Sequence, residues 1–364
     1  MILTYSFIQF KEKKNIPNNS QPQSLLEVIK NSDDDEIKVV AKDLDTPWSI
    51  AFLPNKNILV TERGGKINEI NIETGEKEVT LNVKNVVEIG EGGLLGITLD
   101  PEYQKNSYIY LYYTYKDSGS ATLNRVVRMK YSNKQLGEEN ILLDNIKGAS
   151  NHNGGRIKFG PDNLLYVTTG DADEPSLSQD TSSLSGKILR INSNGSPASN
   201  NPFGNAVYSY GHRNPQGITW DKDGVLWETE HGRSGVLSGF DELNKIEPGK
   251  NYGWKIIQGD ERKEGMVTPV LHSGATNTWA PGGLAYFDGV LYWAGLRGQA
   301  LYKGTINGNE ISLKENFKEE YGRIRDVVVG PDNYLYIATS NKDGRGNPKE
   351  EDDKILRIDP KILN

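Results

Sequence analysis

One pattern recurs six times along this chain: a short apolar strand, a turn rich in Pro, Asp, Asn and Gly, and a second strand rich in Leu, Tyr, Val and Thr. Two copies read RIKFGPDNLLYVTTGD from Arg156 and DVVVGPDNYLYIATSN from Asp326. The first apolar residues of the six copies are Ile50, Ile97, Ile157, Ile218, Leu284 and Val327. Their spacing of about 45 to 65 residues is typical of propellers and solenoids. The pattern therefore restricts the chain to a repetitive fold.

Several copies continue into a third strand, such as KINEINI from Lys66 and KILRIDP from Lys354. Helical periodicity is nearly absent, so the class is all-β. Antiparallel units of three or four strands, repeated six times, predict a six-bladed β-propeller with four-stranded blades. The alternative is a pair of β-sandwiches, which the repetition of the same turn disfavours.

The two ends of the chain predict how the ring closes. Residues 1–36 are polar and carry basic and acidic clusters, which predicts an N-terminal tail or linker. Residues 37–364 are then expected to form one propeller domain. The segment EIKVVAKDL at residues 36–44 has the pattern of a strand, whereas the last copy lacks an outer strand. We expect the N-terminal strand to complete the last blade.

Composition excludes several classes of site. The chain has no cysteine, which excludes disulfides, thiolate zinc sites and a cysteine nucleophile. Its net charge of -7 argues against a nucleic-acid partner. No apolar stretch is long enough for a membrane span. The four histidines have no metal-ligand spacing, and no nucleophile elbow, phosphate-binding loop or dinucleotide fingerprint is present.

In a propeller, the loops that precede the innermost strands converge on the mouth of the central channel. At these positions the chain carries Glu91, His152, Arg213, Asn214, Trp279, Arg323 and Arg325. Each one alone would be ordinary solvated surface. Several arginines in one pocket indicate a polyanionic small ligand, because guanidinium groups pair with carboxylates through two parallel hydrogen bonds.

His152 lies in the loop NHNGGR, and Asp171 ends the strand that follows. A general base needs a pKa near the working pH and a fixed tautomer, which a carboxylate partner supplies. We therefore expect His152 and Asp171 to form a catalytic pair. Gly154 and Gly155 would let a flat ligand approach the backbone. The alternative is a turn histidine that is hydrogen-bonded to nearby backbone.

The chain resembles the soluble pyrroloquinoline quinone (PQQ)-dependent aldose sugar dehydrogenases, the glucose/sorbosone dehydrogenase family. The resemblance spans about residues 44–358 and rests on an ordered set of motifs. These are EGGLLGITLDPEY, NHNGGRIKFGPDNLLYVTTGD, SGKILRIN, YGHRNPQGITW, TEHG, DELNKIEPGKNYGW, APGGLAYF and RIRDVVVGPDNYLY. It implies a six-bladed propeller that binds PQQ and calcium and oxidises aldoses to lactones, passing electrons to an external acceptor.

The resemblance also implies roles for individual residues. His152 would take the proton from the anomeric hydroxyl of the sugar, and Asp171 would orient it. The expected cofactor-binding residues are Glu91, Arg213, Asn214, Trp279, Arg297, Arg323 and Arg325. Family members often have Gln at the position of Glu91, and some have a lysine where Arg297 stands.

Two calcium sites follow from the same resemblance. The backbone carbonyls of Gly232 and Arg233 would bind the catalytic calcium, although proline is common at the second position. Glu242 and the carbonyl of Tyr252 match a second, structural calcium site.

The resemblance implies an extracytoplasmic monomer or homodimer acting on a small-molecule sugar. The opening MILTYSFIQFKEKK is not typical of a signal peptide, because its lysines follow the apolar run. Two other functions remain open from the sequence. One is a calcium-dependent propeller lactonase, which would need carboxylates and asparagines around an axial metal. The other is a non-catalytic propeller that serves as an interaction module.

Overall fold

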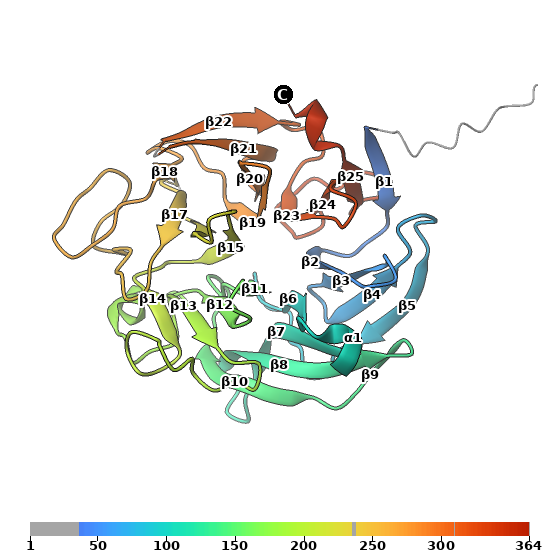
Figure 1. Cartoon of the computed structure of the whole chain (residues 1–364), viewed down its shortest axis with the longest axis horizontal. Coiled ribbons are helices and arrows are strands. Elements are labelled where there is room, and N and C mark those ends of the chain that lie inside the picture. Colours follow the sequence, from blue (N-terminus) through green and yellow to red (C-terminus); the bar gives the residue numbers. More distant parts are fainter. Residues whose placement is uncertain (1–35, 235–237, 309, 364) are drawn as a thin grey trace, which may run out of the picture. The chain divides into compact units, whose positions relative to one another are not determined.

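The computed structural model describes residues 36–234, 238–308 and 310–363, and all but the last residue of the predicted tail lies outside this part. The described residues form six antiparallel sheets arranged as a ring around a central axis (Figure 1). This confirms the predicted six-bladed β-propeller. From the innermost strand outward, the first blade contains β2 (Pro47–Phe52), β3 (Ile58–Glu62), β4 (Lys66–Ile70) and β5 (Lys77–Asn82). The second blade contains β6 (Leu94–Leu99), β7 (Tyr108–Lys116), β8 (Thr122–Ser132) and β10 (Asn140–Lys147). The third blade contains β11 (Ile157–Phe159), β12 (Leu165–Thr169), β13 (Lys187–Ile191) and β14 (Val207–Tyr210).

The other three blades continue in chain order, and only the last one departs from it. Again from the innermost strand outward, the fourth blade contains β15 (Pro215–Trp220), β16 (Leu226–Glu230), β17 (Glu242–Ile246) and β18 (Leu271–His272). The fifth blade contains β19 (Pro281–Phe287), β20 (Val290–Gly295), β21 (Ala300–Asn307) and β22 (Glu310–Asn316). The sixth blade contains β23 (Ile324–Val329), β24 (Leu335–Thr339), β25 (Ile355–Ile358) and β1 (Ile37–Ala41). The short β9 (Gln135–Leu136) adds to β8.

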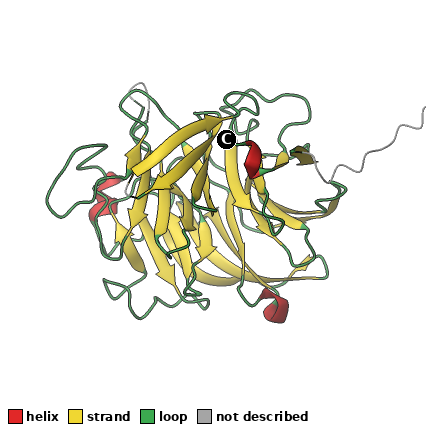
Figure 2. Ribbon diagram, turned by 45° about the horizontal axis from the view of Figure 1, so that its top comes forward, coloured by secondary structure: helices red, strands yellow, loops and turns green. Residues whose placement is uncertain are grey.

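Helices are few and short, as Figure 2 shows. Those in the described residues are α1 (Tyr103–Asn106) and the 3-10 turns η1 (Pro175–Gln179) and η3 (Pro360–Ile362). None of the described helices has the length and apolar composition to cross a membrane. The first apolar residue of each sequence repeat lies on an innermost strand, from Ile50 on β2 to Val327 on β23. The repeat therefore marks the walls of the central channel.

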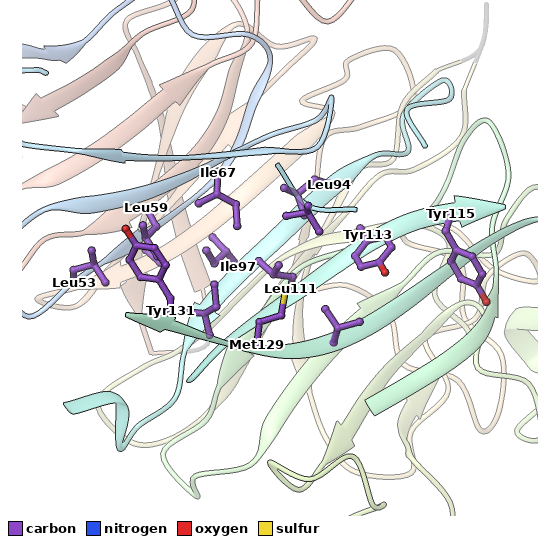
Figure 3. Close-up of a cluster of buried hydrophobic side chains, with 14 residues drawn as sticks. Leu53, Leu59, Ile67, Leu94, Ile97, Leu111, Tyr113, Tyr115, Met129 and Tyr131 are labelled. Atoms are coloured by element: carbon purple, nitrogen blue, oxygen red, sulfur yellow. The ribbon is translucent and has the colours of Figure 1, made fainter. Parts of the chain in front are cut away.

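The hydrophobic core is divided among the junctions between blades. Six clusters of buried side chains each join two neighbouring sheets around the ring. Figure 3 shows the one between the first and second blades, where Leu59 and Ile67 pack against Leu111 and Met129. The second strands β3 and β12 are therefore buried along their whole length, whereas the outermost strands β5 and β22 are largely exposed.

The ring closes through the N-terminal strand, as the sequence predicts. β1 pairs antiparallel with β25, with Ile37 opposite Ile358 and Val39 opposite Leu356. Val40 and Ala41 are buried in the cluster between the last and first blades.

A chain that lacks β1 is expected to unfold at a lower temperature than a chain that begins at Glu36. Burial of a valine side chain contributes roughly 1.5 to 3 kcal/mol, and losing β1 also exposes the edge of β25. We expect the unfolding temperature to fall by about 5 °C or more, measured by calorimetry. Equal unfolding temperatures for chains beginning at residues 36 and 42 would show that the closure contributes nothing to stability.

Candidate active site

A cavity of about 400 Å³ lies where the loops before the innermost strands converge. Glu91, His152 and Arg323 line it from the loops before β6, β11 and β23, and Arg213 lies two residues before β15. The loops between second and third strands complete the wall, including His231 and its neighbours in the fourth blade. Residues that are distant in sequence therefore meet in one pocket, as expected for a propeller.

His152 and Asp171, predicted as a base and its orienting partner, lie within hydrogen-bond distance of each other. Nδ1 of His152 lies 2.8 Å from Oδ1 of Asp171, which is fully buried. The other oxygen of Asp171 accepts a hydrogen bond from Nε1 of Trp254 at 2.7 Å, and Oδ1 also accepts the Asp173 amide at 3.0 Å. A carboxylate held by these donors makes Nδ1 the protonated ring nitrogen. This leaves Nε2 as the nitrogen that can take a proton.

The backbone around His152 is tightly packed, which explains its glycines. His152 itself has a φ of 56°, in the left-handed region. A Cβ on Gly170 would lie 1.8 Å from the carbonyl oxygen of His152, so no larger residue fits there. At Gly154 and Gly155 a Cβ would lie 2.6 Å from Thr169 Cα and from Leu95 Cδ1, respectively. These two glycines allow the loop to pack on neighbouring backbone and core, a role the sequence did not reveal.

Six arginines and three carboxylates line the cavity. Two of the arginines are already paired. Arg323 donates from Nε and Nη2 to the buried Oδ2 of Asp343, at 2.9 and 2.7 Å. Arg345, which lies in no recognisable sequence motif, donates to Glu91 at 2.5 Å and to Asn151 at 3.2 Å.

Pairing with Arg345 fixes the charge of Glu91. Burial of this carboxyl opposes ionisation, but the nearby His231 and Arg345 favour it more strongly and lower the pKa of Glu91 to about 2. Its other oxygen accepts the backbone amide of His152 at 3.2 Å. Glu91 is thus an ionised residue that links Arg345 to the loop of the candidate base.

The other four arginines of the cavity form no ion pair with any carboxylate among the described residues. Their hydrogen bonds go to neutral groups instead. Arg213 donates to the hydroxyl of Ser234, and Arg233 donates to the carbonyl of Ala275. Arg297 donates to the hydroxyl of Ser238, and Arg325 donates to Oε1 of Gln216. In Arg213, Arg233 and Arg325 the Nε atom is buried and has no hydrogen-bond partner in the described part of the chain. Buried donors of this kind are rare unless a ligand completes them.

Burial lowers the pKa of three basic side chains in this cavity, Arg213, His231 and Arg325. It lowers the pKa of Arg325 to about 9 and also lowers the pKa of Arg213. Burial lowers the pKa of His231 to about 4, so this imidazole is neutral at pH 7, and its Nε2 has no partner within the described chain. The cavity therefore combines unneutralised positive charge with unsatisfied polar atoms, which suits a polyanionic ligand.

Residues 44–356 match the family model described as Glucose / Sorbosone dehydrogenase. The chain belongs to this family. The aldose sugar dehydrogenase YliI of Escherichia coli is 29% identical over 357 residues, covering 89% of this chain and 93% of the relative. Quinoprotein glucose dehydrogenase B of Acinetobacter calcoaceticus is 31% identical over 263 residues, covering 63% and 54%. The PQQ-bound aldose sugar dehydrogenase of Streptomyces coelicolor is 41% identical, with a TM-score of 0.82 over 88% of this chain and 97% of that one.

Trp279, which was expected to contact the cofactor of this glucose/sorbosone dehydrogenase, does not line the cavity. Its indole packs in the core between the fourth and fifth blades, with ring centroids 5.3 Å from Trp293 and 5.6 Å from Tyr302. Its neighbours Thr278 and Ala280 line the cavity instead. A large apolar side chain on the loop before β19 can point either into the cavity or into the core between the blades. The sequence alone does not distinguish these two orientations.

Gly232 and Arg233, expected to offer carbonyls to calcium, both line the cavity. Asp241 fixes this loop, because its Oδ1 accepts the Gly232 amide at 2.8 Å while Oδ2 accepts the Trp279 and Ala280 amides. The carbonyl of Arg233 accepts the Gly239 amide at 3.2 Å. These hydrogen bonds hold the Gly232 amide and the Arg233 carbonyl in place even though proline is absent.

Glu242 and Tyr252 line a small adjoining cavity in the fourth blade. Beside Glu242 lie Glu228 and Glu230, on the same face of neighbouring strands. Burial and the charge of Glu230 raise the pKa of both Glu228 and Glu242 well above the ordinary value. Oε1 of Glu228 and Oδ1 of Asn244 are buried without a hydrogen-bond partner from the residues that the structure describes. The buried carboxylates of this cluster therefore repel one another, and their oxygens would be stabilised by a nearby cation.

Proposed function

We propose that this protein is a PQQ- and calcium-dependent aldose dehydrogenase that oxidises the anomeric carbon of a sugar to a lactone. The observation that supports it best is the pairing of His152 with a buried carboxylate beside a cavity of unneutralised arginines. A base with a free nitrogen suits removal of a hydroxyl proton. Excess positive charge suits a cofactor that carries carboxylates.

The residues around the cavity fit such a quinone. The buried, unpartnered Nε atoms of Arg213 and Arg325 are donors for carboxylate or carbonyl oxygens. Nδ2 of Asn214 is also buried and unpartnered, while its Oδ1 holds the Gly154 amide at 3.0 Å. Arg297 reaches the cavity from the β20–β21 loop. These residues would bind the cofactor, which supplies the acceptor for the hydride when it is bound.

The chain's own part in the reaction is to position the sugar and to move one proton. Nε2 of His152 accepts the proton of the anomeric hydroxyl as the hydride leaves the same carbon. Asp171 stabilises the resulting imidazolium through Nδ1, and Trp254 keeps Asp171 in place. The electrons leave for an external acceptor, and the proton leaves His152 for solvent.

Two places suit calcium, which prefers oxygen ligands including backbone carbonyls. The loop of Gly232 and Arg233 would hold one ion at the wall of the cavity, where a cation polarises a carbonyl oxygen. Glu242, with the unpartnered oxygens of Glu228 and Asn244 nearby, would hold a second one. Divalent charge there would offset the repulsion among the buried carboxylates.

The test combines purified protein, PQQ and calcium with a dye acceptor and a panel of aldoses. Dye reduction that requires both PQQ and an aldose supports the proposal. Lactone hydrolysis without the quinone would indicate a lactonase instead. Neither activity nor quinone binding would indicate a non-catalytic propeller.

Replacing Arg345 with glutamine is expected to weaken PQQ binding by about tenfold or more. The substitution leaves Glu91 as an unpaired negative charge facing an anionic ligand, and tenfold corresponds to about 1.4 kcal/mol. The matched variant carries both Arg345→Gln and Glu91→Gln, and it should recover most of the affinity. The measurement is a fluorescence titration with PQQ. Equal weakening in the single and double variants would mean that Arg345 itself binds the cofactor.

A further inference from the structure

A second cavity, of about 230 Å³, lies inside the central channel and shares no lining residue with the first. Stretches of the innermost strands form its wall, including residues 49–52, 97–99, 156–158 and 326–328. Most of these side chains are aliphatic. The polar exceptions are two cations, one carboxylate and a few hydroxyls.

The two cations are Arg156, immediately before β11, and Lys158 on that strand, two positions apart and hence on the same face. Nη1 of Arg156 donates to Ser49 Oγ at 2.9 Å and lies 3.1 Å from Asp326 Oδ1. Its Nε donates to the carbonyl of Gln216 at 2.9 Å. Its Nη2 is buried and has no acceptor among the described residues, and Arg156 as a whole is only 6% exposed.

Lys158 has fewer hydrogen-bond acceptors than Arg156. Its Nζ has one polar contact within the described chain, to Thr219 Oγ1 at 3.5 Å. Burial and the neighbouring charge of Arg156 lower its pKa to about 8. The ammonium is still the main form at pH 7, so it needs an acceptor.

Asp326 cannot neutralise both cations. Its Oδ2 accepts the Ile50 amide at 3.0 Å, and its Oδ1 accepts the Val327 amide at 3.1 Å in addition to Arg156. Two cations and one committed carboxylate leave a net positive charge inside a mainly apolar channel. Arg156 is buried and Lys158 is half-buried, and charge in such a setting is costly unless a counter-ion joins it.

We propose that the central channel binds a small monovalent inorganic anion, such as chloride, between Nη2 of Arg156 and Nζ of Lys158. The anion accepts a proton from Nη2, the guanidinium nitrogen that has no acceptor among the described residues, and supplies the charge that Asp326 does not. The hydroxyls of Ser49 and Thr98 line the same cavity and can donate to it. This site is separate from the arginine-lined cavity and does not rest on the proposed function.

The direct test is diffraction from crystals of the full-length protein soaked in sodium bromide, because bromide scatters anomalously. We expect an anomalous peak in the channel within hydrogen-bond distance of both nitrogens. Water at that position and no bromide peak would overturn the proposal.

A solution test compares unfolding temperatures in sodium chloride and in sodium gluconate at equal ionic strength. An anion that binds only the folded state raises the unfolding temperature of the wild type, by about 3 °C or more at saturating chloride. Lys158→Met should lose this chloride-specific increase. Lys222→Met, which removes a lysine paired with Asp223 on the surface, should retain it. An equal chloride response in Lys158→Met and the wild type would contradict the proposed site.

Discussion

Replacing His152 with asparagine is expected to lower turnover by roughly 100-fold to 10,000-fold, the range for losing general base catalysis. The physical reason is the geometry of the pair. Asp171 holds Nδ1 at 2.8 Å, so the ring presents Nε2 to the substrate, and an asparagine amide has no basic nitrogen to replace it. Steady-state kinetics with saturating PQQ, calcium and aldose measure the effect.

Binding of PQQ should change little in the same variant, because the arginines that would hold it lie elsewhere around the cavity. The matched control is His272→Asn, which removes a histidine that contacts Asp260 outside the cavity. It should keep normal turnover. Wild-type turnover in His152→Asn with bound quinone would show that His152 is only a turn residue.

Replacing Arg325 with methionine is expected to weaken PQQ binding by about 10-fold to 100-fold. A hydrogen bond to a charged group contributes roughly 1.5 to 3 kcal/mol, and each 1.4 kcal/mol is a factor of ten. Arg325 is a cleaner target than Arg323, since it has no carboxylate partner and its removal leaves no buried anion behind. Removal of Arg323 would leave Asp343 buried and unpaired.

The control for this variant is Arg357→Met. Like Arg325, which lies over the ring of Trp48, Arg357 lies over an aromatic ring, that of Tyr334. It differs in pairing with Asp332, and it lies on β25, away from the cavity. Its replacement should leave the PQQ titration unchanged. An unchanged titration in folded Arg325→Met would remove this residue from the cofactor site.

The sequence predicted the fold well because each blade repeats the same local signals. Six similar strand–turn–strand units and one surplus strand at the N-terminus are enough to specify a closed ring. Details that depend on side-chain direction were less accessible. Trp279 was expected in the pocket, yet a large apolar ring gains more from the core beside Trp293.

The candidate site was predicted in part for a similar reason. His152 and Asp171 could be paired because each follows or precedes a recognisable strand. The partners Arg345 and Asp343 lie in the long loop between β24 and β25, whose path no periodic pattern specifies. Trp254 likewise reaches Asp171 from a segment without regular strands. Contacts between irregular loops follow from the ring as a whole and not from local sequence.

The blade that joins the two chain ends imposes an order on folding. The pairing of Ile37 with Ile358 means that β1, the first strand of the described residues, waits for β25 to be synthesised. Such non-local pairings form slowly. A nascent chain that ends before Ile355 has an open ring, with β24 as an unpaired edge able to pair with another chain. Closure of the ring is therefore expected to be a late step of folding, and the interval before it is when the polypeptide is most exposed to aggregation.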